Sequence, residues 1–274
     1  MNKARFDRLE VITCSPRGTV RTTTPLLFLH GAYTAAWCWQ EHFLPFFAAA
    51  GFQGYALSFS GHGGSRHRDQ LDHYSIDDYV GDVVEAVASL PAPPVLIGHS
   101  MGGFVVQKYL EKHTAPAAVL MCSVPPQGLA ASAFGMLFGG RANLLSDLNS
   151  LMTGGQVALE SLREALFAQP VAVADLARYH RMAQPESHRA IWDMTLFNLP
   201  HTAAVMAHLP KDGLLVQGAE HDMIIAASLV EMTARSYGVG AKIFPGMGHG
   251  LMLEADWKTP AQQIVDWLNE RALP

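Results

Sequence analysis

One short turn constrains the fold of this chain more than any other feature. The apolar residues 95–97 lead directly into residues 98–103, Gly-His-Ser-Met-Gly-Gly, and a helical pattern follows over residues 104–110. This spacing predicts a strand, a sharp turn and a helix, with strained backbone angles at the serine and glycines where side chains would collide. The turn presents Ser100 at a helix start and places the Met101 backbone N–H where it can stabilise an oxyanion.

Short apolar runs bounded by turn residues recur along the chain and predict buried strands. They cover residues 26–29, 54–57, 95–97, 117–121 and 214–217, and we expect a further strand at 241–244. Helical patterns lie between them, at about residues 39–50, 76–90, 101–112, 228–237 and 260–271. Ser75 and Asp78 predict a capping box at the second of these helices. The alternation predicts an α/β fold with a doubly wound, mostly parallel sheet.

The alternation of strands and helices stops after Ser123. Residues 125–208 show helical patterns without convincing strands, and the strand pattern resumes at Leu214. We therefore expect one core domain, made of residues 1–124 and 209–274, with a helical cap, residues 125–208, inserted in it. A chain of 274 residues, 49% of them apolar, fits such a domain with an insertion better than two independent domains.

The composition excludes several classes of partner. A formal charge of −5 without a long run of lysine or arginine argues against nucleic acid and anionic lipid. The apolar stretches are shorter than the roughly 18–20 residues that a membrane span needs. Residues 1–10 lack the continuous apolar segment of a secretory signal. We expect a cytoplasmic protein that acts on a small molecule, with no membrane partner, and the oligomeric state is left open.

Two downstream loops supply the groups that a nucleophilic serine needs. A serine hydroxyl requires a base, and a carboxylate must orient that base. Asp222 follows the strand expected at 214–217, and His249 follows the strand expected at 241–244. Glu220 lies on the same loop as Asp222 and competes with it for the role of the acid. Because parallel strands end at one edge of a sheet, Ser100, His249 and Asp222 are predicted to form a catalytic triad, with no metal or cofactor.

Several segments together resemble the α/β-hydrolase superfamily over nearly the whole chain. They are residues 27–32 (Leu-Phe-Leu-His-Gly-Ala), 58–65, 98–103, 218–222 and 248–249. In that superfamily the residue after His-Gly donates its backbone N–H to the oxyanion. The resemblance therefore implies that Ala32 and Met101 form the oxyanion hole, and that Asp222 is the acid.

A local likeness and a local departure accompany this resemblance. Residues 30–39 are similar to the corresponding segment of plant-type methylesterases and hydroxynitrile lyases. Many relatives carry Asp and then Arg ahead of the Gly-His-Gly run, whereas this chain has Ser58, Phe59 and Ser60. We expect this change to affect the packing of the loop more than catalysis.

These observations predict a serine esterase that cleaves a carboxylic ester through an acyl-enzyme. The same triad suits a lactone, a thioester or a carbon–carbon bond beside a carbonyl, and lactonase is the leading alternative. A ligand receptor with a hydrolase fold is an alternative of a different class. Ser100 argues against the haloalkane dehalogenases and epoxide hydrolases of this fold, which use a carboxylate nucleophile. Ala32 argues against a hydroxynitrile lyase, because the resemblance calls for a hydroxyl-bearing residue there.

The expected cap is rich in large apolar side chains. They are Phe134, Met136, Leu137, Phe138, Leu144, Leu145, Met152, Phe167, Met182, Trp192, Met194, Phe197 and Met206. Most of them should form the core of the cap and its contact with the main domain, and the surplus should line an apolar cleft over Ser100. This favours a neutral, hydrophobic substrate, and the residues that bind it are left open.

Overall fold

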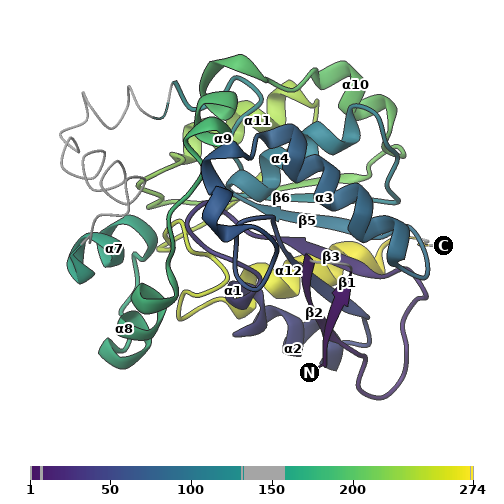
Figure 1. Cartoon of the computed structure of the whole chain (residues 1–274). Helices are drawn as coiled ribbons and strands as arrows, with labels where there is room; N and C mark the ends of the chain where they lie inside the picture. Colours follow the sequence, from purple (N-terminus) through teal and green to yellow (C-terminus); the bar gives the residue numbers. More distant parts are fainter. Residues whose placement is uncertain (1, 7–8, 131, 133–157, 272, 274) are drawn as a thin grey trace.

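The backbone pairs into a single mixed sheet (Figure 1). In the computed structural model, which describes residues 2–6, 9–130, 132, 158–271 and 273, eight strands pair in the order β1-β2-β4-β3-β5-β6-β7-β8. The strands are β1 (Asn2–Phe6), β2 (Leu9–Cys14), β3 (Leu26–Leu29), β4 (Gly54–Ser58), β5 (Val95–His99), β6 (Ala118–Met121), β7 (Leu214–Ala219) and β8 (Ala241–Phe244). Strands β3 to β8 run parallel to one another, whereas β2 pairs antiparallel with β1 and β4. The predicted mostly parallel sheet is confirmed.

The antiparallel strands β1 and β2, of which β1 forms the edge of the sheet, were not among the predicted elements. In β2, Leu9, Val11 and Ile12 are buried, whereas Glu10 and Thr13 are partly exposed. A strand at this position faces solvent in part, so its sequence lacks the continuous apolar run of the central parallel strands. The prediction relied on such runs and therefore began the sheet at β3.

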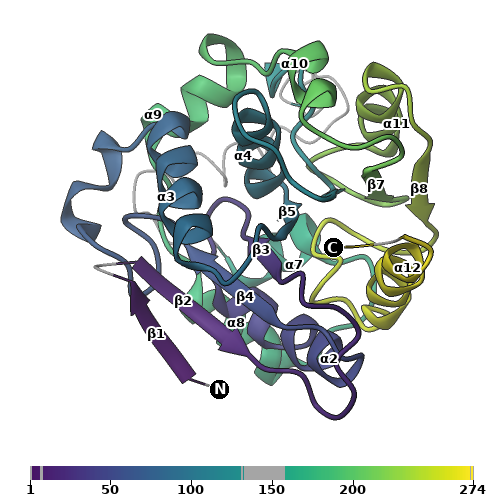
Figure 2. The ribbon, with the colours of Figure 1, turned by 90° about the vertical axis from the view of Figure 1, so that its right-hand side faces the viewer.

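Side chains of the central strands alternate between two apolar cores, one on each face of the sheet. In β3, Leu26 and Phe28 join the first core, and Leu27 and Leu29 join the second. The first face is covered by α1 (Trp37–Gln40), α2 (Phe43–Ala49) and α12 (Lys258–Asn269), and the second by α3 (Ile76–Ser89), α4 (Met101–Leu110) and α11 (Ala227–Ser236). Figure 2 shows α2 and α12 on the side of the sheet opposite α3 and α4, as the term doubly wound requires.

The helix predicted over residues 39–50 is divided into α1 and α2. Pro45 occupies the first turn of α2, where its missing N–H costs no helical hydrogen bond. Helix α3 begins as predicted, because Ser75 accepts a hydrogen bond from the Asp78 backbone and the Asp78 carboxylate accepts one from Ser75. A short 3₁₀ segment, η1 (Arg68–His73), precedes α3.

Between β6 and β7 the described residues form helices and no strand. They are α7 (Leu159–Leu166), α8 (Val173–Met182), α9 (His188–Trp192), the π-helical turn η2 (Asp193–Phe197) and α10 (Thr202–Ala207). Helices α7 and α8 lie at the end of the sheet away from the chain's C-terminus (Figure 1). The helical insertion is thus present, and its boundaries at residues 125 and 208 stay a prediction.

The large apolar residues of the insertion differ in their surroundings. Phe134, Met136, Leu137, Phe138, Leu144, Leu145 and Met152 lie outside the described residues. Phe167 and Met194 are buried, whereas Trp192 and Phe197 are exposed. Across the described part of the chain, every helix is too short or too polar to span a bilayer.

The contact between α4 and β3 generates a prediction about stability. A Cβ atom at Gly102 would lie 2.3 Å from the backbone oxygen of Leu29, so Gly102→Ala should lower the free energy of unfolding by at least about 3 kcal/mol. At Gly81, inside α3, a Cβ atom would meet nothing within 4 Å, and Gly81→Ala should raise it by about 0.5–1 kcal/mol. Urea denaturation of both variants measures the difference. Equal stabilities would show that α4 does not need this close approach.

Candidate active site

The turn between β5 and α4 holds Ser100 in a conformation that few side chains adopt. Ser100 has a φ of 53° and a ψ of −116°, and α4 begins at the next residue. A Cβ atom at Gly98 would lie 2.4 Å from the backbone oxygen of Gly102, and one at Gly103 would lie 2.4 Å from Ser123 Oγ. The glycines therefore permit the close packing of strand and helix that forces the serine into this strained turn.

His249 and Asp222 form a buried hydrogen bond beside this turn. His249 Nδ1 lies 2.7 Å from Asp222 Oδ2, and both side chains are almost fully buried. Asp222 Oδ1 accepts the backbone N–H groups of Ile224 at 2.8 Å and Ile225 at 2.7 Å. Because an ionised carboxylate only accepts, the proton of a neutral His249 lies on Nδ1, and Nε2 keeps its lone pair for a proton from elsewhere.

His99 connects the loop of His249 to the Ser100 turn. The His99 Nε2–H donates to the His249 carbonyl oxygen at 2.8 Å, and the two imidazole rings lie 4.6 Å apart between centroids. Burial, and the neighbouring His249, hold the pKa of His99 well below its ordinary value. His99 is therefore a neutral hydrogen-bond donor that fixes the His249 backbone next to the serine.

The competing carboxylate, Glu220, makes a different contact. Its side chain is 52% exposed and accepts the backbone N–H of Gly246 at 2.9 Å. Glu220 therefore stabilises the turn after β8, whereas Asp222 is the hydrogen-bond partner of His249. The ambiguity between the two acids arose because both follow β7 closely, and the direction of each side chain is set by the packing of the loop.

The segment after β3 lies against the Ser100 turn. A Cβ atom at Gly31 would lie 2.8 Å from His99 Nδ1 and 3.0 Å from Ser100 Cβ. The Gly31 carbonyl oxygen accepts hydrogen bonds from His30 Nδ1 at 2.8 Å and from the Thr34 hydroxyl at 2.9 Å. The Gly31 carbonyl and the Ala32 N–H belong to the same trans peptide and point in opposite directions. The two hydrogen bonds to the carbonyl therefore also set the direction of the Ala32 N–H.

His30 can donate to the Gly31 carbonyl and accept from a second group because its ring is neutral. Its Nε2 accepts the Phe59 backbone N–H at 3.1 Å, which leaves the proton on Nδ1. Burial lowers the pKa of His30 to about 3, and the nearby His62 contributes in the same direction. The segment that carries Ala32 thus lies against the Ser100 turn, and Met101 begins α4, where the first backbone N–H groups have no helical partner.

Cys122 is a further neighbour of the pair. The sulfur of Cys122 and single ligand atoms of Asp222 and His249 lie within 4.8 Å of one another. Burial, together with the charge of Asp222 and a hydrogen bond to it, raises the pKa of the thiol well above its ordinary value. Metal binding by cysteine requires a thiolate, so a protonated Cys122 is a poor ligand. The absence of a metal stays a prediction.

Two buried glutamates connect the insertion to the loops of the site. Glu254, in the loop before α12, accepts the N–H groups of Gly248 at 2.6 Å, Ala168 at 2.8 Å and Gln169 at 3.2 Å. It therefore joins the loop of His249 to the segment after α7. Burial raises the pKa of Glu254, and these backbone donors oppose the shift.

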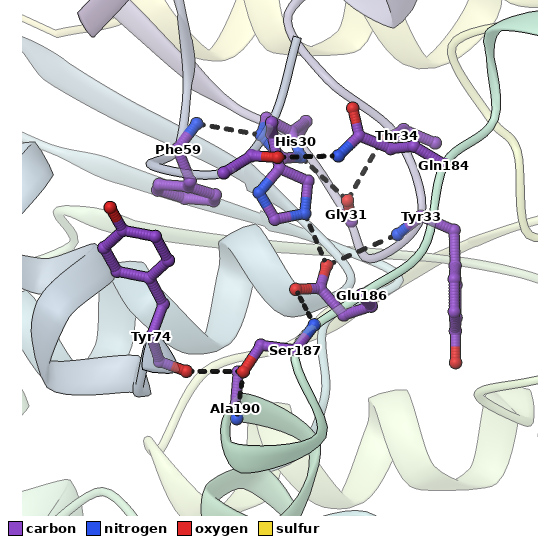
Figure 3. Close-up of polar contacts among 12 residues, drawn as sticks. His30, Gly31, Tyr33, Thr34, Phe59, Tyr74, Gln184, Glu186, Ser187 and Ala190 are labelled. Atoms are coloured by element: carbon purple, nitrogen blue, oxygen red, sulfur yellow. Dashed lines mark hydrogen bonds and ion pairs between the residues drawn. The ribbon is translucent and has the colours of Figure 1, made fainter. Parts of the chain in front are cut away.

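Glu186, between α8 and α9, reaches the other side of the site. Figure 3 shows its carboxylate among residues of the His30–Thr34 segment and of the insertion. It accepts hydrogen bonds from His62 Nε2 at 3.0 Å and from the Tyr79 hydroxyl at 2.8 Å. His62 Nδ1 faces the Ser60 carbonyl at 3.1 Å. Both ring nitrogens of His62 face acceptors, which favours a protonated imidazole.

The charges of this pair follow from opposing effects. Burial alone would lower the pKa of His62, but the charge and hydrogen bond of Glu186 raise it above its ordinary value. Burial alone would raise the pKa of Glu186, but the charge of His62, with hydrogen bonds from His62, Ser187 and Tyr79, lowers it. We therefore describe the pair as a buried imidazolium and carboxylate. Neither glutamate was predicted from the sequence, because a single acidic residue outside any motif has no spacing that marks it.

Comparisons with known proteins agree on one family. The model of the alpha/beta hydrolase family matches residues 26–266. Protein phosphatase methylesterase 1 of Bos taurus is 30% identical over 168 residues, which are 60% of this chain and 40% of the relative. The chain thus spans less than half the length of these methylesterases. A monoacylglycerol lipase of Mycolicibacterium smegmatis is 27% identical over 241 residues, 83% of this chain and 82% of the relative.

Solved structures show the same fold at low sequence identity. A bromoperoxidase from Bacillus anthracis aligns with a TM-score of 0.76 at 16% identity, over 95% of both chains. An esterase from Exiguobacterium antarcticum aligns with a TM-score of 0.72 at 18% identity, also over 95% of both chains. At this identity the likeness concerns the fold alone.

The His62–Glu186 pair predicts a pH-dependent stability difference. In the folded chain the pKa of His62 is raised from 6.5 and that of Glu186 is lowered from 4.5. The contribution of His62 to stability is complete below pH 6.5 and is lost as the pH rises through its folded pKa. The contribution of Glu186 is complete above pH 4.5 and is lost as the pH falls through its folded pKa. Glu186→Gln should therefore lower the free energy of unfolding most near pH 5.5, by about 3 kcal/mol, and by less at pH 9.

Urea denaturation of both proteins at the two pH values measures this difference. His30 and Asp82, which also act on His62, are present in both proteins, so their contributions largely cancel. A difference that grows from pH 5.5 to pH 9 would contradict the charged pair.

Proposed function

The chain belongs to the alpha/beta hydrolase family, and from that premise we propose that it hydrolyses a carboxylic ester of a small, hydrophobic substrate through an acyl-enzyme. The observation that supports this most directly is the buried hydrogen bond between His249 Nδ1 and Asp222, next to the strained Ser100 turn. The names of two relatives, a methylesterase and a monoacylglycerol lipase, agree with ester cleavage.

In the proposed reaction, Ser100 Oγ attacks the ester carbonyl while His249 Nε2 removes its proton. Asp222 keeps the other ring proton on Nδ1 and stabilises the imidazolium that forms. The imidazolium then protonates the leaving alcohol. Water attacks the acyl-enzyme by the same route, with His249 as base, and releases the acid and the free serine.

The negative charge that develops on the carbonyl oxygen needs donors that are already oriented. We propose that the backbone N–H groups of Ala32 and Met101 are these donors. The Ala32 N–H has its direction set by the bonds of the Gly31 carbonyl to His30 and Thr34. The Met101 N–H lies at the positive end of α4. Removal of one such donor typically costs about 10²–10³-fold in kcat.

Aromatic side chains support a neutral, hydrophobic substrate. Phe167 packs over the loop of His249, where its Cε1 would lie 3.5 Å from a Cβ atom at Gly250. Its ring stacks on Tyr179 at 6.1 Å, and Tyr179 stacks on Trp37 at 5.7 Å. Arg178 lies over the Tyr179 ring, but its guanidinium already binds Glu41 and Asp175. This group beside the loop of His249 is therefore apolar, and the arginine packed on it has its charge paired.

Replacing each of the two neighbouring acids by its amide tests the proposed triad. Asp222→Asn should lower kcat on the order of 10⁴-fold on a nitrophenyl ester, because an amide that donates to His249 stabilises the wrong tautomer. The matched control Glu220→Gln should lose at most a few-fold, since Glu220 contacts Gly246 and the exposed His221 and makes no bond to His249 among the described contacts. Steady-state kinetics on nitrophenyl esters of several acyl lengths, with lactones and thioesters for comparison, measures both effects.

Two results would count against this proposal. A wild-type protein that turns over none of these esters would refute ester hydrolysis. If Glu220→Gln were the inactive variant and Asp222→Asn the active one, the acid would be two residues earlier in the chain than proposed.

A further inference from the structure

A short segment of the insertion binds the backbone beside the proposed oxyanion hole. We call residues Gln184, Pro185, Glu186 and Ser187, between α8 and α9, the clasp. The Gln184 N–H donates to the Tyr33 carbonyl at 3.0 Å, and the Tyr33 N–H donates to Glu186 Oε2 at 3.4 Å. Both backbone polar groups of Tyr33 therefore bind the clasp, as Figure 3 shows for the Tyr33 N–H.

Tyr33 needs such support because its backbone is strained. Its φ is 64°, in the left-handed region that residues other than glycine seldom adopt. A residue in this region is strained, and the conformation persists only where the surrounding structure fixes it. Tyr33 directly follows Ala32, so its conformation helps to set the position of the Ala32 N–H. The clasp acts on the Tyr33 side of Ala32, whereas His30 and Thr34 hold the Gly31 carbonyl on the other side.

The clasp is itself anchored to the core at two points. The Gln184 side chain accepts the Gly63 N–H at 2.9 Å and donates to the Gly61 carbonyl at 3.1 Å. Glu186 is fully buried and binds His62 and Tyr79. The same carboxylate oxygen of Glu186 contacts both His62 and the Tyr33 N–H. A displacement of Glu186 from His62 would therefore also move the acceptor of the Tyr33 N–H.

A buried ion pair is a costly way to achieve packing alone. Apolar residues of similar volume often give equal or greater stability, whereas a paired charge can specify one geometry. Glu186 meets this description, because it is placed where its oxygens satisfy four donors: His62, Tyr79, Tyr33 and the Ser187 N–H. This favours a role in fixing a particular backbone conformation.

We propose that Glu186 is a positioning residue for oxyanion stabilisation, acting through Tyr33 to hold the Ala32 N–H toward the reacting carbonyl. The insertion then contributes to the chemical step. This inference rests on the proposed ester hydrolysis for its effect on rate, but the restraint on Tyr33 is independent of any activity.

Glu186→Gln tests this role, with Glu160→Gln as its matched control. Glu160 is an exposed acid of α7 that pairs with Arg163, so its change removes the same charge from the insertion without touching the clasp. On a nitrophenyl ester, Glu186→Gln should lower kcat between about 10- and 100-fold and leave KM within about twofold, because a displaced donor affects the transition state more than substrate binding. Glu160→Gln should match the wild type in both constants.

Amide hydrogen exchange of the Tyr33 N–H provides a second measurement that needs no turnover. The loss of its charged acceptor should speed this exchange about tenfold in Glu186→Gln and leave it unchanged in Glu160→Gln. If Glu186→Gln does not fold, Tyr79→Phe removes one donor to Glu186 and should give smaller changes in the same direction in both measurements.

The outcomes separate this inference from the proposed function. Unchanged exchange in the folded variants would overturn the role of Glu186 whatever the activity. Faster exchange with unchanged kcat in an active enzyme would also overturn it, because the restraint would then have no effect on the reaction. If the wild type hydrolyses no ester, the proposed function and the effect on rate both fail, and exchange alone decides whether Glu186 restrains Tyr33.

Discussion

The strained turn at Ser100 is the constraint on which the rest of the site depends. The backbone can enter the left-handed region there because Gly98, Gly102 and Gly103 let β5, α4 and β3 approach within distances that a side chain would block. Strand and helix together then fix the position of the serine. The strain is offset by the two apolar cores that the sheet and its helices bury on either side.

Three loops converge on this turn, and each is held by buried polar groups. His99 binds the backbone of His249, and Asp222 binds the ring of His249. Glu254 joins the same loop to the segment after α7. In the loop after β3, Tyr33 is bound by Gln184 and Glu186 of the clasp. Contacts with the insertion therefore reach both the proposed base and the proposed oxyanion hole, which makes the insertion part of the site's architecture.

The central sheet and the candidate site could be predicted from sequence because they rest on local patterns. Buried parallel strands are short apolar runs, and Ser100 and Asp222 each follow one of them, whereas His249 follows the partly exposed strand β8. The antiparallel strands β1 and β2 have no such run, and the break between α1 and α2 lies just before a single proline. Glu186 and Glu254 were missed for a different reason: their roles come from contacts with residues far away in the chain, such as His62 and Ala168. Long-range pairing of single residues leaves no periodic signal.

The central claim is that the turn makes Ser100 the nucleophile. Reaction with diethyl 4-nitrophenyl phosphate, followed by peptide mass spectrometry, tests it directly, because an activated serine displaces nitrophenolate and keeps the diethylphosphoryl group. This account predicts one adduct, on the peptide that contains Ser100, formed together with the loss of ester hydrolysis. An adduct on a different residue, or hydrolysis that continues after Ser100 is fully modified, would contradict it.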